Sequence, residues 1–453
     1  MGTASESAGV LTFEQARDTV LDYCTQIAPP PIEERALFKV PTGRLAVGRV
    51  LAEPIQADRD FPPFPRATRD GYAVRSVDVK SVPTTLRVLG QVKAGGSFER
   101  AVGAGEAVEI MTGAGVPEGA DAVVMLEYTA PKNPSSANEG VGQIEVEINR
   151  AVGAGENIVA AGAEARAGQE LLTRGVRLGP AEIAMAAAVG QARISVYRRP
   201  IVTILSTGDE LVEIDKVPGP SEIRNSNGYS LAAQVLAAGG RALPLSLAPD
   251  KESELRLLIE AGLDLGDLLL ISGGVSAGKF DFVEPTLKSL GAKFFFTGAL
   301  IQPGRPVVFG EVDSPGINSR QVRLERHPRM PELIEPRKVR TRVPFFGLPG
   351  NPISAMVCFD LFAQPVVEAL GGAAPRRLPA AKARLKREFR TRTGLTRFLP
   401  ANLQGGLYDP EVETIPWQGS GDLAAAVRAN CYLIVPPDRD VLPAGEMVSV
   451  VLR

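Results

Sequence analysis

Four polar turns, each beside an apolar stretch, hold most of the residues in this sequence that could do chemistry. They read STGDE (206–210), APD (248–250), SGGVSAGKFD (272–281) and GLPGNPISA (347–355). Backbone amides in such turns, above all where a helix begins, can hold a phosphate or another oxyanion. If the apolar stretches are neighbouring parallel strands, the turns converge at one sheet edge and form a site. The alternative is that glycine and proline only punctuate ordinary loops.

Five carboxylates lie beside glycine or proline turns rather than on helix faces: Asp70, Asp209, Glu210, Asp250 and Asp281. Hard cations such as Mg²⁺ prefer oxygen ligands and keep water molecules while they bridge a substrate phosphate. Taken singly, each acid could equally be a turn or cap residue. Together they indicate a cation site, provided that they converge on the same edge as the turns.

A cationic candidate, Arg305, belongs to the turn QPGRP at 302–306, which precedes an apolar stretch. The planar fork of a guanidinium suits a tetrahedral oxyanion or a phosphate. An ordinary surface arginine is the alternative.

The segment GGVSAGKF has the glycine and lysine spacing of a phosphate-binding P-loop. A P-loop needs a Ser or Thr hydroxyl for the magnesium ion directly after its lysine, whereas Phe280 follows Lys279 here. This mismatch leaves a P-loop-like nucleotidase as the minor alternative.

The composition argues against several classes of protein. The 453 residues carry 50 Lys and Arg against 52 Asp and Glu, a net charge of -2, so no basic field favours nucleic acid. No apolar run approaches the ~20 residues of a membrane span, and the first segment lacks signal-peptide features, so we expect a cytoplasmic protein. With His327 the single histidine and three cysteines far apart, neither a catalytic triad nor a disulfide framework or zinc site is expected.

The pattern along the chain predicts several domains. Helical spacing of apolar residues predicts a helix over 12–24, and alternating stretches over about 86–148 predict a small β domain inserted into an extended first unit. From residue 201 the alternation of strand, turn and helix predicts parallel βαβ units. The stretch 313–342 has no clear period and is interpreted as a surface insertion, and the last part of the chain predicts a small β-barrel or sandwich.

Eight motifs, in order along the chain, together resemble those of one known family. They are PFPRATRDGYAVR (63–75), IMTGAGVPEGADAVVMLE (110–127), GENIVAAGAE (155–164), STGDEL (206–211), IRNSN (223–227), SGGVSAGKFDF (272–282), QPGRP (302–306) and GLPGNPISA (347–355). The family is that of the molybdopterin molybdenumtransferases, which includes the E domain of gephyrin. Any one motif is weak, but eight in family order cover nearly the whole chain.

The resemblance implies a multidomain α/β and β fold with a three-layer α/β domain built on a mostly parallel sheet. The implied division is an extended, discontinuous N-terminal domain (10–56 plus 153–198), an inserted small β domain (57–152), an α/β molybdopterin-binding domain (199–373) and a C-terminal β-barrel (374–453). It also implies a homodimer whose cleft is shared between subunits.

By the same resemblance, the chain would insert molybdate into adenylylated molybdopterin and release molybdenum cofactor and AMP, with Mg²⁺ assisting. The molybdopterin adenylyltransferase is a further expected partner. Because molybdenum arrives as an oxyanion and leaves on the sulfurs of the pterin, no protein cysteine or histidine has to bind it.

The family's site residues carry over position by position. Glu210 and Asp281 match acids proposed to hold magnesium, Asp70 and Asp250 match other acids of the cleft, and Arg305 matches a cation near the anions. The remaining positions match loops expected to bind the nucleotide and the pterin or molybdate: Thr207, Gly208, Asp209, Asn227, Ser272, Gly273, Gly274, Ser276, Pro303, Gly304, Pro349, Gly350, Asn351, Pro352 and Ser354.

Several positions depart from the family pattern. Milder departures are Ala67, Arg69, Glu164 and Asn225. Lys279 stands in place of an acid and Gln302 in place of a lysine, which we interpret as an exchange of charge between the two positions. These departures keep open a second function, that of a scaffold which binds the pterin without turnover.

Overall fold

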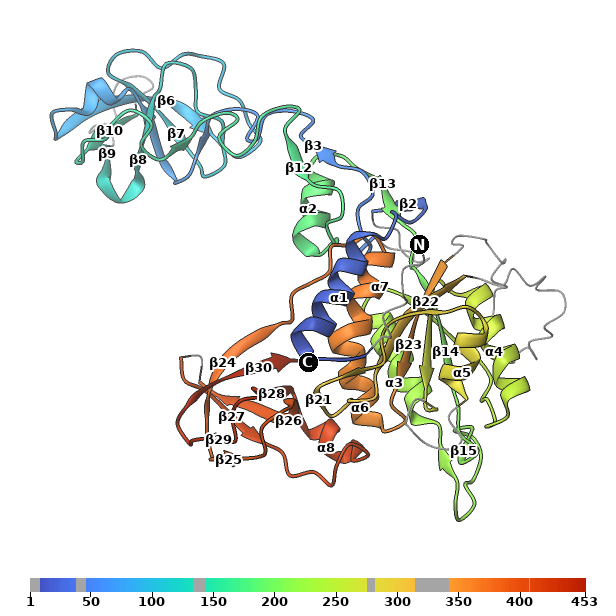
Figure 1. Cartoon of the computed structure of the whole chain (residues 1–453). Helices are drawn as coiled ribbons and strands as arrows, with labels where there is room; N and C mark the ends of the chain where they lie inside the picture. Colours follow the sequence, from blue (N-terminus) through green and yellow to red (C-terminus); the bar gives the residue numbers. More distant parts are fainter. Residues whose placement is uncertain (1–8, 38–45, 133–143, 275–281, 314–341, 407) are drawn as a thin grey trace, which may run out of the picture.

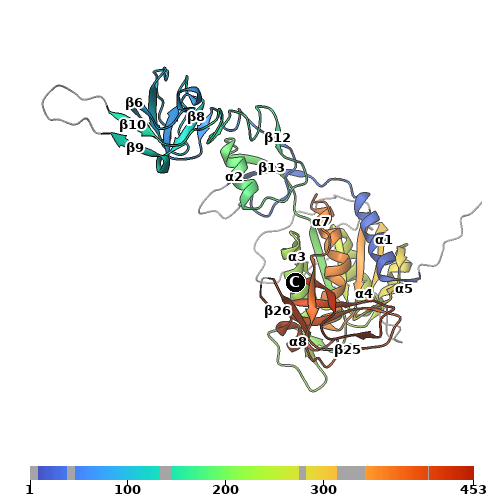
Figure 2. The same ribbon diagram turned by 90° about the vertical axis from the view of Figure 1, so that its left-hand side faces the viewer.

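Three six-stranded sheets organise the computed structural model, which describes residues 9–37, 46–132, 144–274, 282–313, 342–406 and 408–453. One sheet belongs to a central α/β unit, one to a C-terminal barrel beside it, and one to a small β domain (Figure 1). The small β domain stands at the end of a long arm, away from the other two units (Figures 1 and 2). The predicted multidomain α/β and β fold class is confirmed.

The sheet of the α/β unit is mostly parallel. In spatial order its strands are β17 (Arg241–Pro244), β14 (Ile201–Ser206), β18 (Leu268–Ser272), β23 (Arg342–Leu348), β22 (Val308–Asp313) and β19 (Lys293–Phe296). Neighbours from β17 to β23 are parallel, whereas β22 and β19 run antiparallel to the strands before them. Every residue of β18 is buried, as expected for a parallel strand covered on both faces.

Helices cover both faces of this sheet and make three layers. On one face lie α3 (Ser226–Ala237) and a continuous helix formed by α6 (Pro352–Cys358), a π-helical turn η3 (Phe359–Ala363) and α7 (Gln364–Leu370). On the other face lie α4 (Glu252–Leu265) and α5 (Val283–Ser289). Side chains of β18 alternate between the two cores, since Leu268 and Leu270 pack in the first and Leu269 and Ile271 in the second.

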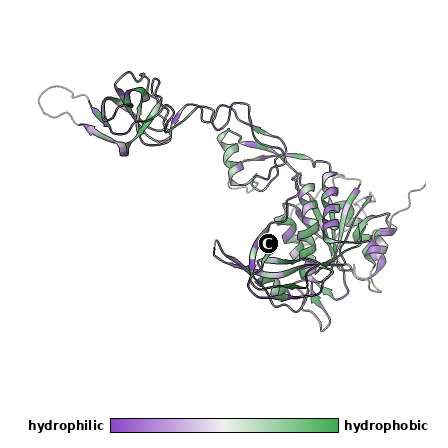
Figure 3. Cartoon of the chain, turned by 60° about the vertical axis from the view of Figure 1, so that its left-hand side comes forward, coloured by the Kyte–Doolittle hydropathy of each residue, from purple (hydrophilic) through white to green (hydrophobic). Residues whose placement is uncertain are grey.

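The continuous helix Pro352–Leu370 has 19 residues and is apolar enough to cross a membrane by length and composition. In this protein 89% of its most apolar 18-residue window is buried, and its side chains fill the first core of the α/β unit. Figure 3 shows hydrophobic residues gathered in this unit. Burial on most sides therefore explains why most of this helix is apolar.

The first helix, α1 (Phe13–Thr25), begins at Thr12, whose side chain forms a capping box with Gln15. Its stripe of Ala16, Val20 and Cys24 packs in the first core of the α/β unit, against α7. The short strand β1 (Val10–Leu11), just before it, pairs with β20 (Gly298–Ala299). Helix α1 also contacts η3, so its apolar stripe is buried against the continuous helix Pro352–Leu370 before the chain enters the arm.

The arm consists of two chain segments that run out and back as short antiparallel pairs. These pairs are β2 (Ile32–Ala36) with β13 (Arg193–Tyr197), β3 (Ile55–Gln56) with β12 (Glu170–Leu172), and β4 (Arg66–Ala67) with β11 (Ile158–Val159). Helix α2 (Pro180–Ala188) packs beside them around a small core of its own.

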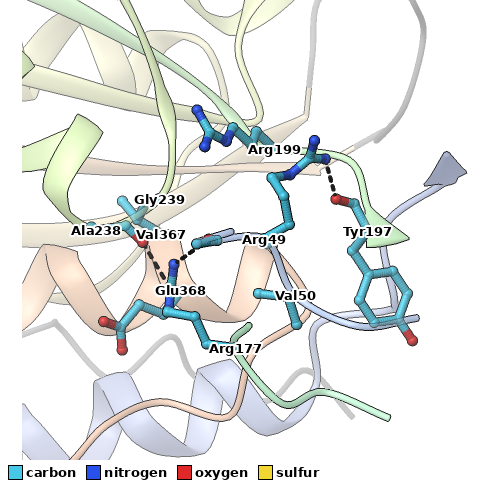
Figure 4. A pocket seen from close by; sticks show the side chains of 11 residues that line it. Arg49, Val50, Arg177, Tyr197, Arg199, Ala238, Gly239, Val367 and Glu368 are labelled. Atoms are coloured by element: carbon cyan, nitrogen blue, oxygen red, sulfur yellow. Dashed lines mark hydrogen bonds between the residues drawn. The ribbon is translucent and has the colours of Figure 1, made fainter. Parts of the chain in front are cut away.

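A small cavity of about 10 Å³ lies where the arm meets the α/β unit (Figure 4). Arg177 crosses this junction and donates to Gly48 O at 3.1 Å and to Ala238 O at 3.0 Å. Arg49 donates to Tyr197 O at 2.7 Å and pairs with Glu33. A volume of this size accommodates about one water molecule, so the junction is a structural contact rather than a substrate site.

The small β domain is a sheet with a core on each face. Its strands, in spatial order, are β8 (Ala122–Met125), β5 (Gly71–Val74), β7 (Glu106–Ile110), β6 (Thr84–Val92), β10 (Glu145–Ile148) and β9 (Thr129–Lys132). Two short helical turns, η1 (Ser76–Val79) and η2 (Leu126–Tyr128), follow β5 and β8. Tyr72 and Val74 of β5 pack on one face and Ala73 on the other. This β domain therefore folds around its own side chains.

The C-terminal unit is a closed barrel of five strands, as predicted. Around the ring they are β26 (Thr396–Gly405), β27 (Pro410–Thr414), β24 (Ala380–Leu385), β30 (Met447–Leu452) and β28 (Cys431–Val435), which pairs back to β26. Smaller elements are β25 (Phe389–Arg390), which pairs with β29 (Val441–Leu442), and α8 (Leu423–Arg428). From the α/β unit, β21 (Ile301–Gln302) adds to β26 in parallel, so this strand pair joins the two units.

Candidate active site

A pocket of about 820 Å³ lies at the carboxyl edge of the α/β sheet. The last residues of β14, β18 and β23 are in register there, with Ser206 beside Ser272 and Ser272 beside Leu348. The polar turns predicted from the sequence follow these strand ends. Of the predicted site residues, the pocket is lined by Thr207, Gly208, Glu210, Asn227, Asp250, Ser272, Gly273, Gly274, Pro349, Gly350, Asn351 and Pro352. We call it the larger pocket.

Glycine is required where two of these turns touch. Gly273 has φ +95°, and a Cβ built on it would lie 2.3 Å from the carbonyl oxygen of Thr207. The amide of Gly273 donates to Leu348 O at 3.1 Å, and the amide of Thr207 donates to Ser272 O at 3.0 Å. The turns after β14 and β18 therefore pack with their backbones in contact, which any side chain at 273 would prevent.

Asn227, near the start of α3, links the turn after β18 to the turn after β23. Its Nδ2 donates to Ser272 Oγ at 2.8 Å and to Gly350 O at 2.7 Å, and the residue is only 8% exposed. Within the described part of the chain, its Oδ1 is buried without a hydrogen-bond partner. Neighbouring Asn225 caps α3 by accepting from the amide of Gly228 at 3.0 Å. Asn227 thus holds the turns after β18 and β23 at a set distance.

The acids of the larger pocket have different surroundings. Thr207 Oγ1 donates to Asp250 Oδ1 at 3.0 Å, and the amide of Asp250 donates to Asp209 Oδ1, also at 3.0 Å. Glu210 folds back over the turn, with its Oε2 2.5 Å from the position that a Cβ on Gly208 would take. Asp209 does not line the pocket and acts as a turn residue that positions Asp250.

A second pocket of about 440 Å³ adjoins the first, since Pro306, Pro349 and Asn351 line both. We call it the smaller pocket. Its lining includes the predicted residues Pro303, Gly304, Arg305 and Ser354, together with Gln302. Gly304 has φ +107°, and a Cβ there would lie 2.4 Å from Cys358 Sγ, so this turn packs tightly on α6.

The barrel supplies a wall that the sequence analysis missed. Trp417, Gly419 and Ser420 line the smaller pocket, and Gly421 and Leu423 line the larger one. The amide of Ile353 in α6 donates to Ser420 O at 2.9 Å, which ties this loop to the α/β unit. The stretch QGSGD at 418–422 has the glycine and serine content of the four predicted turns, and this signal could have identified it.

Asp70 is not brought to either pocket within one chain. It precedes β5 in the small β domain, which stands apart from the pockets in both views (Figures 1 and 2). The amide and the hydroxyl of Thr112 donate to Asp70 Oδ1 at 2.7 Å and 2.9 Å. These hydrogen bonds to the charged form lower the pKa of Asp70, so the exposed side chain is a carboxylate at neutral pH.

The remaining predicted residues, Ser276 and Asp281, lie outside the described residues, as does Lys279. Among the residues that the structure describes, no three acids, histidines or cysteines are grouped closely enough to hold a metal ion by themselves.

The fold and these pockets define a class: a multidomain α/β protein whose two adjoining pockets suit an elongated, negatively charged small molecule. Strand-end turns line one pocket, and Arg305 lines the other.

Comparisons with known proteins identify the family. Family models match residues 11–190 (MoeA N-terminal region, domain I and II), 203–369 (probable molybdopterin binding domain) and 382–452 (MoeA C-terminal region, domain IV). The molybdopterin molybdenumtransferase of Haemophilus influenzae is 30% identical, with 97% of this chain and 98% of that protein covered. That of Bacillus subtilis is 31% identical over 89% of this chain and 87% of that protein. The chain belongs to the MoeA family of molybdopterin molybdenumtransferases.

Solved structures agree with this assignment. Two crystal structures of the molybdopterin biosynthesis MoeA protein from Pyrococcus horikoshii match 98% of this chain. One is 30% identical with a TM-score of 0.66 over 99% of its chain, and the other is 27% identical with a TM-score of 0.71 over 100%. The resemblance seen in the sequence motifs is confirmed, and it gives no support to a P-loop nucleotidase.

Proposed function

We propose that this chain inserts molybdate into adenylylated molybdopterin and releases molybdenum cofactor and AMP. The observation that carries the proposal is the pair of adjoining pockets with different chemistry. One substrate, the pterin nucleotide, has phosphates at one end and a dithiolene at the other, and the second substrate is an oxyanion. A continuous pair of pockets would hold both substrates side by side.

In the proposed reaction, the dithiolene sulfurs replace oxo groups of molybdate, which leave as water once protonated, and water cleaves the phosphoric anhydride to release AMP. The turns at Gly274 and Gly350 would lie against the phosphates, and Arg305 would offset the charge of molybdate. Asp250, held by Thr207, is available to orient the attacking water.

We extend the proposal to a magnesium ion in the larger pocket. Mg²⁺ is typically bound by one or two carboxylates plus substrate phosphates, and a single described acid, Glu210, folds over the turn where those phosphates would lie. Asp281 is proposed as its companion on the strength of the sequence pattern. When bound, the ion would neutralise charge on the phosphates. Because Gly208 has no side chain, the carboxylate of Glu210 has room to lie over this turn.

We further propose a homodimer in which Asp70 of one copy completes the site of the other. Within a single chain, the small β domain that carries this carboxylate stands at the end of the arm, away from the α/β unit and the barrel (Figure 2). The aspartate is nevertheless fixed in its charged form by Thr112, as a functional acid would be. The molybdopterin adenylyltransferase, whose product is the substrate here, is proposed as a transient partner.

The test of turnover is an incubation of the purified chain with adenylylated molybdopterin, magnesium and molybdate, with AMP release and cofactor formation followed in time. We expect AMP release that depends on molybdate. If the chain binds the pterin nucleotide but releases no AMP, it is a scaffold. If it hydrolyses ATP without pterin or molybdate, it is a nucleotidase.

The shared site has its own test, in which Asp70→Asn and Glu210→Gln variants are mixed and allowed to exchange subunits. Each variant alone should be nearly inactive. In a homodimer with shared sites, a mixed dimer regains one intact site of two, so the mixture should recover about a quarter of wild-type turnover. No recovery after demonstrated exchange would exclude a site that Asp70 of the second copy completes.

A further inference from the structure

The smaller pocket has an imbalance of charge for the ligand proposed to enter it. Among its described lining residues, Arg305 is the only cation, and Gln302 beside it is neutral. Molybdate is a dianion. One exposed guanidinium offsets one of its two charges, which leaves the second without a partner in the lining.

A second cation, Arg397, lies on β26, the strand that pairs with the strand of Gln302. In the parallel pair of β21 and β26, Gln302 and Arg397 are register partners, so their side chains leave the sheet on the same face. The guanidinium of Arg397 donates to Leu395 O at 3.2 Å, and Leu395 itself lines the smaller pocket. Arg397 thus reaches back along β26 toward the pocket wall.

Within the described residues, Arg397 lacks a counter-charge. It is 7% exposed and forms no ion pair with any described carboxylate. Other buried arginines differ, since Arg49 pairs with Glu33 and Arg198 pairs with Asp267 at 2.8 Å. Burial lowers the pKa of Arg397, and no neighbouring acid opposes that shift. A buried cation without a negatively charged partner destabilises a folded protein unless a bound ligand supplies the negative charge.

We propose that Arg397 is a positioning residue which supplies the second positive charge of the smaller pocket and makes it selective for tetrahedral dianions over monoanions. The inference rests on the proposed function, because it takes the smaller pocket as the oxyanion site. It names a described residue as a source of the charge that Gln302 lacks. The cation absent at 302 is provided from the neighbouring strand.

The test uses two oxyanions of the same tetrahedral shape and different charge, molybdate (dianion) and perrhenate (monoanion). Trp417 is the single tryptophan of the chain and lines the smaller pocket, so its fluorescence reports binding without turnover. The Coulomb energy scales with the charge of the ligand. Loss of one cation that lowers the affinity for a dianion by about tenfold should therefore lower the affinity for a monoanion by about threefold. We expect Arg397→Gln to weaken molybdate binding by about tenfold and perrhenate binding by about threefold.

Rescue separates this role from a merely structural one. The double variant Gln302→Lys with Arg397→Gln should recover molybdate affinity, because the charge returns on the adjacent strand, and Arg397→Lys should keep most of it. Arg384→Gln, an exposed arginine of the same barrel, is the matched control and should change neither affinity. Thermal unfolding of each variant shows whether the barrel is intact.

Three results would each overturn the proposal. They are an equal loss of affinity for the two anions, an unchanged affinity in the folded Arg397→Gln variant, and no recovery of molybdate affinity when Gln302→Lys is added. So would a wild-type chain that binds neither anion in this pocket. If wild type shows the expected charge selectivity yet releases no AMP, the proposed turnover fails while the role of Arg397 stands.

Discussion

The two adjoining pockets differ in charge although they share Pro306, Pro349 and Asn351. The larger pocket is lined by the acids Glu210 and Asp250, whereas the described lining of the smaller one has no acid. Arg224 also lines the larger pocket, but its Nε donates to backbone carbonyls of Ile214 and Lys216. The contrast favours a metal and phosphate end in the larger pocket and an oxyanion end in the smaller.

The difference follows from how each pocket is built. The larger pocket is formed mainly by turns at the ends of neighbouring parallel strands, where backbone amides collect and acids fit between them. The smaller pocket lies where β21 joins the barrel, so it takes side chains from two units, such as Arg305 and Trp417. Substitutions should therefore affect one end of the paired site at a time.

The largest effect on turnover is expected from Glu210→Gln, which removes charge from the larger pocket at little change of shape. We expect molybdate-dependent AMP release to fall by about 100- to 1000-fold, because electrostatic groups of an active site commonly contribute that much. Molybdate binding reported by Trp417 should stay unchanged. A matching loss of molybdate affinity would show that the two pockets are not chemically separate.

The reverse pattern is expected for Arg305→Gln. Loss of a charge-assisted hydrogen bond should weaken molybdate binding by about 10- to 100-fold. Affinity for a nucleotide probe such as AMP should change little, since Arg305 does not line the larger pocket. Titrations with molybdate and AMP, followed by Trp417 fluorescence and by calorimetry, check this prediction. If the affinity for AMP fell as much as the affinity for molybdate, the two pockets would not be chemically separate.

Gly273→Ala tests the contact of turns that shapes the larger pocket. At φ +95° and with a Cβ only 2.3 Å from Thr207 O, alanine should cost about 2 to 3 kcal/mol of stability. Gly291→Ala is the matched control, because Gly291 has φ +79° but open space around it, and it should cost only about 1 kcal/mol. Denaturant unfolding measures both. An equal loss of unfolding free energy in the two variants would mean that the turns after β14 and β18 can move apart to make room for a side chain at 273.

The smallest effect on the site is expected from Asp360→Asn, in the helix whose first turn lines the two pockets with Pro352 and Ser354. Burial raises the pKa of Asp360 to about 6, above its ordinary value of 3.8, although Gln234 donates to it at 2.6 Å. The folded state therefore holds this proton more tightly than the unfolded chain, and stability falls as pH rises through about 4 to 6.

Asparagine cannot ionise, so the melting temperature of Asp360→Asn should drop less than that of wild type between pH 4 and pH 7. Turnover at neutral pH should be nearly unchanged. Parallel melting curves for the two proteins would show that Asp360 does not titrate in this range.

The sequence alone determined where the larger pocket would form. Apolar runs that end in polar turns specify parallel strands, and carboxyl ends of such strands meet at one edge, so the residue pattern by itself groups Ser272, Gly273 and Asp250. The capping box at Thr12 also follows from local pattern, whereas the pattern of the C-terminal strands left a barrel or a sandwich open. These features depend on the periodicity of neighbouring residues, which a sequence displays directly.

The tertiary structure decided which of those residues share a pocket and which do not. In the folded chain Asp209 accepts a hydrogen bond from the amide of Asp250, and Asp70 lies in the small β domain. Helix α1 packs against α7, and Trp417 lines the smaller pocket with Arg305. The register of β21 on β26 set Arg397 opposite Gln302. Such contacts join residues far apart in the chain, and they depend on how whole units pack, which no local pattern records.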